Sequence, residues 1–215
     1  MTSLKEGDAT ELIASSPQEF TLHTQRQLVR IYPASLRTSS SNFCPFAYWR
    51  VGCQMVALNY QTNGCAMRMY RGHFLQNGNC GYVLKPANLR EGWSGSILPP
   101  SPNYLKVTVI SGQYLPVTAG GVVNPYVSLK ICGHPDDNFK WKSKSIANNG
   151  FNPHWDETVE ALVKDRYQAI VCFTVKDKRT VGSVFIGSYA LPFNSLMLGK
   201  SHSIQFHCTL INTWR

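Results

Sequence analysis

The spacing of apolar residues changes once along the chain, at a segment rich in Gly, Pro and Ser that spans residues 89–104. Before this segment, apolar runs such as LVRIYP and QMVALNYQT alternate with stretches of helical character such as TELIASS and HTQRQL. Alternation of this kind is typical of a parallel sheet. After it, runs such as LKVTVISG and AIVCFTVKD have a period of two and recur between turn signals, which is typical of an antiparallel sandwich. The sequence therefore predicts two domains of different fold classes joined by a linker.

The two predicted domains differ in whether they can close on their own. A sandwich of about 110 residues can bury its own core. A βα stretch of about 90 residues with three clear strands, LVRIYP, QMVALNYQT and GYVLKP, cannot bury both faces of a parallel sheet. We therefore expect the first part to be the end of a larger domain, the front of which lies outside this chain.

The chain is basic, with a formal net charge of +9, and the distribution of charge limits what that can mean. Residues 1–100 hold nine Lys and Arg against five Asp and Glu, and residues 101–215 hold twelve against seven. Neither half carries a basic stripe with interleaved aromatics, so we expect no nucleic-acid partner. An anionic membrane surface fits better, because each nearby Lys or Arg contributes about 1 kcal/mol without any motif. With neither a signal peptide nor a spanning segment in the sequence, we expect a cytoplasmic protein that is peripheral at the membrane.

The cysteines do not indicate a structural framework. The sequence has seven, an odd number, scattered widely and without CxxC spacing. Neither a disulfide scaffold nor a zinc site is therefore expected.

The run LVRIYP places an arginine and a tyrosine two residues apart on a short strand. Residues two apart point to the same side, so Arg30 and Tyr32 share one face, and Pro33 ends the strand just beyond them. An arginine offers a planar fork of donors that matches phosphate oxygens, and a tyrosine offers a ring and one hydroxyl. Taken alone, such a pair is more often an ordinary surface pair than a ligand clamp.

Longer motifs give the pair a context. The segments LVRIYPASLRTSSSNFCPFAYWRVGCQMVALNYQT and NGNCGYVLKP closely resemble the second catalytic half, or Y region, of eukaryotic phosphoinositide-specific phospholipase C, over residues 1–91. VISGQYLP, NGFNPHWDE and FIGSYALPF resemble the C2 domain that follows it, over residues 104–215, which leaves residues 92–103 as the linker. HTQRQL, YPAS and ALNYQT are closer to the epsilon class than to the delta class.

The resemblance implies a fold and a reaction. The fold is α/β, the last strands of a TIM-type barrel, followed by an all-β antiparallel C2 sandwich. The family cleaves phosphatidylinositol 4,5-bisphosphate to diacylglycerol and inositol trisphosphate in intracellular signalling. By resemblance, Arg30 and Tyr32 contact the substrate phosphate and the inositol ring, and Ser3 lies where the family places a serine that contacts a ring phosphate. The rim where strands end is where such barrels assemble their sites.

The catalytic machinery is expected elsewhere. By resemblance, the acid/base histidines and the acidic Ca²⁺ ligands belong to the first barrel half, and none of the six histidines here lies in a recognisable family motif. We therefore expect no catalytic residue in this chain, which would be inactive alone and would need the missing N-terminal barrel half as a partner.

The sandwich lacks most of the carboxylates that a calcium-binding C2 domain uses. At the matching positions stand Asn124, Asn148 and Asp177, with Arg179 where the family commonly has another aspartate. Calcium affinity follows ligand charge, so Asn148 and Asp177 are weak metal positions. Lys176, Lys178 and Arg179 could instead form a basic edge toward anionic lipid; alternatively, the domain packs on the barrel or the loop has no role.

A second function class stays open at this point. A noncatalytic membrane or protein adaptor could retain the barrel and contacts such as Arg30 while losing the chemistry. The upstream coding sequence discriminates between the two, because two rim histidines with acidic calcium ligands indicate the enzyme. Small or heterotrimeric G proteins are candidate regulators of the parent protein, and the sequence does not choose between them.

Overall fold

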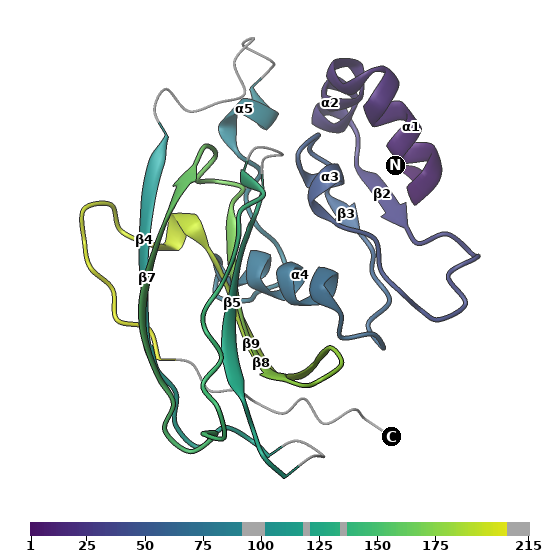
Figure 1. Ribbon diagram of the computed structural model, residues 1–215. Coiled ribbons are helices and arrows are strands. Elements are labelled where there is room, and N and C mark those ends of the chain that lie inside the picture. The colour runs from purple at the N-terminus through teal and green to yellow at the C-terminus, as the bar shows by residue number, and fades with distance from the viewer. Residues whose placement is uncertain (92–101, 118–120, 134–136, 206–215) are drawn as a thin grey trace. The chain divides into compact units, whose positions relative to one another are not determined.

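The computed structural model describes residues 1–91, 102–117, 121–133 and 137–205. The chain forms two compact units, Met1–Ser101 and Pro102–Arg215 (Figure 1). Most of the predicted linker lies outside the described residues, so its boundaries stay a prediction. Within the described residues, no helix has the length and apolar character needed to cross a bilayer.

The first unit is built on a parallel sheet in the order β1-β2-β3. Its strands are β1 (Thr2–Lys5), β2 (Val29–Tyr32) and β3 (Met55–Val56). The predicted parallel arrangement is confirmed, since β1 pairs with β2 and β2 with β3 in parallel. Each connection between neighbouring strands contains helix, as parallel pairing requires.

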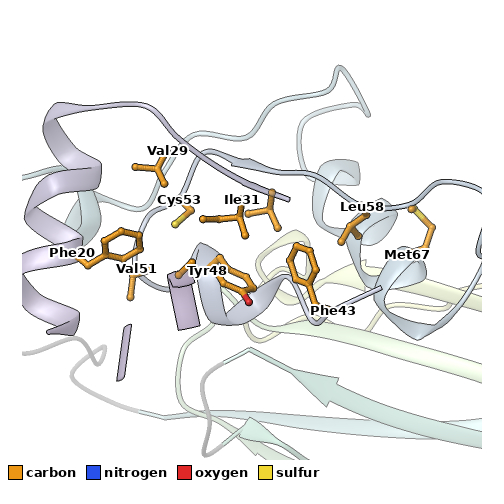
Figure 2. Packing of buried hydrophobic residues seen from close by; sticks show 11 residues of the cluster. Phe20, Val29, Ile31, Phe43, Tyr48, Val51, Cys53, Leu58 and Met67 are labelled. Atoms are coloured by element: carbon orange, nitrogen blue, oxygen red, sulfur yellow. The ribbon is translucent and has the colours of Figure 1, made fainter. Parts of the chain in front are cut away.

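Helices cover one face of this sheet. Buried side chains of α1 (Glu6–Ser15), α2 (Pro17–Arg26), α3 (Phe46–Trp49) and α4 (Cys65–Leu75) share one core with β2, and α5 (Ala87–Arg90) contacts α2. Pro17 opens α2, where its missing N–H costs no helical hydrogen bond. Figure 2 shows the resulting core, in which Val29 and Ile31 of β2 are fully buried beside Phe20 and Tyr48.

Three segments of the first unit differ from the sequence prediction. β1 was not predicted, because its four residues carry too short a pattern. The strand expected over QMVALNYQT contracts to β3, because beyond Ala57 the backbone finds no further strand partner: Asn59 N–H donates to Asn42 Oδ1 at 2.6 Å. GYVLKP is not a strand, and the Tyr82 carbonyl accepts a hydrogen bond from Asn77 Nδ2 at 3.0 Å.

The second unit is an antiparallel sandwich of two sheets, β4-β7 and β6-β5-β8-β9, as predicted. Its strands are β4 (Asn103–Ser111), β5 (Pro125–Cys132), β6 (Lys140–Lys142), β7 (His154–Val163), β8 (Ile170–Lys178) and β9 (Ser183–Pro192), followed by the short helix η2 (Phe193–Ser195). Leu129 and Ile131 from one sheet and Val163 from the other meet in its core. The last predicted strand, SIQFHCTLI, is not formed at residues 203–205 and otherwise lies outside the described residues.

Candidate functional site

The arginine and the tyrosine of LVRIYP lie together on the face of the sheet that the helices leave open. Along β2, burial alternates: Val29 and Ile31 are buried, Arg30 is exposed and Tyr32 is half-buried. The Arg30 guanidinium carbon lies 5.1 Å from the centroid of the Tyr32 ring. This is cation–π geometry, in which the ring orients the guanidinium while its donors stay available.

Ser3 joins this pair through the register of the sheet. β1 and β2 run parallel with Ser3 opposite Arg30 and Lys5 opposite Tyr32. Residues in register on neighbouring strands project from the same face, and Ser3 and Lys5 are both exposed. We call these four residues, Ser3, Lys5, Arg30 and Tyr32, the polar sheet face.

Lys5 is a candidate that the sequence reasoning missed. It occupies the last position of β1, so its side chain stands at the carboxyl end of the strand, in register with Tyr32. The signal in the sequence was the alternation in TSLK, which becomes visible once TSLK is known to be a strand. Lysine supplies a point charge where arginine supplies a fork, and both suit phosphate.

The polar sheet face can bind an anion but contains neither a histidine nor a carboxylate. Its members are a hydroxyl, an ammonium, a guanidinium and a phenol. Two cations and two hydroxyl groups fit a phosphorylated, hydroxyl-rich ligand, whereas an acid/base pair would need histidine or carboxylate side chains. The geometry therefore defines a binding surface, and the roles of the individual residues stay predictions.

The second candidate region is the end of the sandwich where β5 begins and β8 ends. Asn124 connects the segments there: its side-chain Oδ1 accepts the Asn148 N–H at 2.9 Å, and its carbonyl accepts the Lys178 N–H at 2.9 Å. Asp177 Oδ1 in turn accepts the Asn124 N–H at 2.8 Å. The structure thus brings together Asn124, Asn148 and Asp177.

These residues do not fit a divalent cation. The Asp177 side chain is fully buried, and its Oδ2 lies 2.5 Å from Arg179 Nη2, so a guanidinium occupies the position beside the carboxylate. A calcium ion needs six to eight oxygens, several of them anionic, and here the carboxylate oxygens already contact protein donors. In the described part of the chain, no group of three or more His, Cys, Asp or Glu side chains could hold a metal ion.

The contact between Arg179 and Asp177 also reduces the basic edge expected from Lys176, Lys178 and Arg179. Arg179 is 26% exposed and bound to Asp177, so it is held toward the protein. Lys178 is exposed and Lys176 is half-buried, two residues apart on β8 and therefore on the same side of the strand. At this edge, Lys176 and Lys178 are therefore better placed than Arg179 to contact anionic lipid.

Comparison with known proteins agrees with both folds. Residues 1–88 match the family model of the phosphatidylinositol-specific phospholipase C Y domain, and residues 103–208 match the C2 domain model. In the crystal structure of L. pealei PLC21, 26% of that chain aligns with 90% of this one, at 31% identity and a TM-score of 0.79.

Three relatives illustrate the range of similar sequences. Human 1-phosphatidylinositol 4,5-bisphosphate phosphodiesterase eta-1 is 41% identical over 93% of this chain and 12% of its own length. The delta-4 phosphodiesterase of Xenopus laevis is 42% identical over 94% of this chain and 28% of its own length. Human inactive phospholipase C-like protein 1 is 39% identical over 94% of this chain and 20% of its own length. The chain thus spans less than a third of the length of each relative.

A parallel βα sheet with a polar open face, followed by an antiparallel sandwich, is the architecture of the Y domain and the C2 domain that the two family models match. The chain belongs to the phosphoinositide-specific phospholipase C family, as its Y domain followed by a C2 domain. The three relatives above do not include the epsilon class, and an epsilon-like subclass stays a prediction.

Proposed function

We propose that this chain forms the substrate-binding part of a phosphoinositide phospholipase C that hydrolyses phosphatidylinositol 4,5-bisphosphate to diacylglycerol and inositol trisphosphate. The observation that carries the proposal is the polar sheet face, where Arg30 stands 5.1 Å from the Tyr32 ring and opposite Ser3 in the sheet. In this proposal the arginine binds the substrate phosphate, the tyrosine ring packs on the inositol, and the serine contacts a ring phosphate.

The test of this site is isothermal titration calorimetry, which measures the affinity of the chain for inositol 1,4,5-trisphosphate. Arg30→Ala should weaken binding by about tenfold to a hundredfold, since a hydrogen bond to a charged group contributes about 1.5–3 kcal/mol. Arg71→Ala is the matched control, because Arg71 is an exposed arginine of α4. Equal affinities for wild type and Arg30→Ala would contradict the assignment.

In the proposed reaction, this chain binds substrate and a second barrel segment supplies the chemistry. Calcium lowers the pKa of the attacking hydroxyl when it is bound in the family's catalytic centre, and its ligands are expected in that second segment. The open, polar face of the sheet supports a barrel half as the partner. Hydrolysis of the lipid by the purified chain alone, in calcium, would contradict this division of labour.

We further propose that the C2 sandwich docks the protein on anionic membrane without using calcium. Two observations support this proposal. Arg179 contacts the Asp177 carboxylate, which is then not available to a calcium ion, and Lys178 is exposed beside it. Sedimentation with phosphatidylserine vesicles should show binding that falls as salt rises and ignores calcium. Binding that requires calcium would overturn this part of the proposal.

A noncatalytic adaptor is the second candidate function. It is favoured by one observation, the 39% identity to human inactive phospholipase C-like protein 1, which is nearly as high as the identity to the two phosphodiesterases above. Substrate contacts can persist in either class. Lipid hydrolysis by the protein that contains both barrel halves would exclude the adaptor. Headgroup binding without hydrolysis would support it.

A further inference from the structure

A bidentate ion pair lies next to the polar sheet face without belonging to it. Glu6 follows β1 directly, as the first residue of α1. Arg37 Nε donates to Glu6 Oε1 and Arg37 Nη2 to Glu6 Oε2, both at 2.7 Å. The side chains are 12% and 27% exposed, so the pair is partly shielded from water. Fork-to-fork geometry of this kind fixes orientation as well as adding energy.

The carboxylate of Glu6 also holds the backbone. Oε1 accepts the Ala34 N–H at 3.0 Å, and the Arg37 N–H donates to the Ala34 carbonyl at 3.1 Å. The Glu6 side chain therefore binds both ends of the turn from Ala34 to Arg37, through the backbone N–H of Ala34 and the guanidinium of Arg37. The hydrogen bond to Arg37 is the main reason why the pKa of Glu6 lies below its ordinary value of 4.5, so the carboxylate is charged at neutral pH.

The pair is anchored to the core on its other side. The hydroxyl of Tyr48, a residue buried in the core of the first unit, donates to the Glu6 carbonyl at 3.1 Å. The Arg37 guanidinium carbon lies 5.9 Å from the ring centroid of Phe43, which is also buried there. Glu6 therefore connects a fixed core to the chain that leaves β2.

That chain segment is the one that carries the candidate ligand residues. Tyr32 ends β2, Pro33 follows, and Ala34 is the residue that Glu6 holds. The connection from Pro33 to Pro45 contains no helix or strand. Pro33 has no N–H, so the first backbone donor after Tyr32 is that of Ala34. Without the Glu6 carboxylate, the Ala34 N–H would lose the hydrogen bond that holds the backbone just beyond the carboxyl end of β2.

We propose that Glu6 and Arg37 are positioning residues: their ion pair fixes the backbone after β2, so that Tyr32 and Arg30 face a phosphorylated inositol in the orientation that binds it. Neither residue touches the ligand in this proposal. The inference rests on the proposed function for its ligand, whereas the positioning itself is a property of the free chain.

The first test reads the geometry of the free chain by NMR. The Tyr32 ring current shifts the side-chain protons of Arg30, so these signals report the distance between the two groups. Glu6→Gln, Arg37→Gln and the double variant should all move the Arg30 and Tyr32 signals, and by similar amounts, since all three break one pair. Arg37→Lys keeps the charge but loses the fork, and should give an intermediate shift.

The matched control is Glu11→Gln, the same change at an exposed position of α1. It should leave the Arg30 and Tyr32 signals in place. Unchanged Arg30 and Tyr32 signals in folded Glu6→Gln would overturn the proposal, even if the Ala34 amide moves. If Glu6→Gln does not fold, the milder Arg37→Lys decides by the same signals.

The second test measures affinity for inositol 1,4,5-trisphosphate. Glu6→Gln and Arg37→Gln should each weaken binding by about tenfold, the double variant no more than either, and Glu11→Gln not at all. Additive losses would contradict the pair. If the wild-type chain does not bind the headgroup, the proposed function fails for this chain, while the NMR signals still decide the positioning.

Discussion

At the scale of single residues, Arg179 contributes to the stability of the sandwich through a contact with a buried carboxylate. Its partner Asp177 has a fully buried side chain, and their contact is 2.5 Å. Removing one partner of a buried pair leaves a charge away from water, which typically costs about 3–5 kcal/mol. We expect Arg179→Ala to lower the free energy of unfolding of the sandwich by about 2 kcal/mol or more, measured by urea denaturation.

Lys106→Ala provides the comparison for that measurement. Lys106 pairs with Glu160 at 3.2 Å, but the two side chains are 69% and 67% exposed. Exposed pairs contribute about 0–1 kcal/mol, so this variant should unfold close to wild type. Equal effects of the two substitutions would show that the Arg179 contact is not a buried pair in solution.

Much of the candidate site could be predicted from the sequence at this scale, and the reason is local. The side-chain period of a strand places Arg30 and Tyr32 on one face, whatever the surrounding fold. Lys5 could not be found in this way, because its place depends on pairing with a strand whose facing residue, Tyr32, is 27 positions away. Glu6 and Arg37 were missed for the same reason, since their contact spans 31 positions.

At the scale of elements, α3 and α4 meet through aromatic rings. Trp49 of α3 stacks on His73 of α4 with ring centroids 4.1 Å apart and 17° between planes, and Tyr70 and Phe74 lie in the same cluster. Burial lowers the pKa of His73 to about 4. The folded state thus holds the neutral ring at pH values where an unfolded histidine, with a pKa of 6.5, is already protonated.

The sign of the pH effect follows from that depressed pKa. The contribution of His73 to stability is fully present above about pH 6.5 and is lost progressively as the pH falls toward 4, by at most about 1.4 kcal/mol per pH unit. His73→Phe keeps a ring against Trp49 but cannot be protonated. Urea denaturation at pH 7 and pH 5 should therefore show a smaller loss of stability for His73→Phe than for wild type. An equal loss of stability for His73→Phe and wild type would contradict the role of His73.

The elements that sequence reasoning found were those with long or strictly alternating patterns. β5 and β8 have eight and nine residues, burial alternates along most of β5, and the two strands pair from Pro125 opposite Asp177 to Cys132 opposite Ile170, so both were predicted. Of the nine residues of the strand predicted over QMVALNYQT, two form β3. The apolar residues of this segment serve core packing as well as strand pairing. Leu58, from the same run, is buried in the core although it lies beyond β3.

At the scale of the whole molecule, the two units should differ in independence. The sandwich buries a core between two sheets, whereas the sheet of the first unit has helices on one face and exposed polar residues, Ser3, Lys5 and Arg30, on the other. We expect residues 102–215 alone to melt in a single cooperative transition by calorimetry, and residues 1–101 alone to aggregate or melt without cooperativity. A sharp, reversible transition of the first unit alone would contradict this expectation.

The in-register pairing of β1 with β2 has a consequence for how sequences of this kind can vary. Residues 6–28 connect the two strands through α1 and α2, and a length change in that connection leaves Ser3 opposite Arg30. One residue inserted inside either strand would instead exchange the inward and outward positions of that strand, and an insertion in β2 ahead of Arg30 would turn the Arg30 guanidinium toward the helices. Natural insertions and deletions should therefore accumulate between the strands and spare both of them.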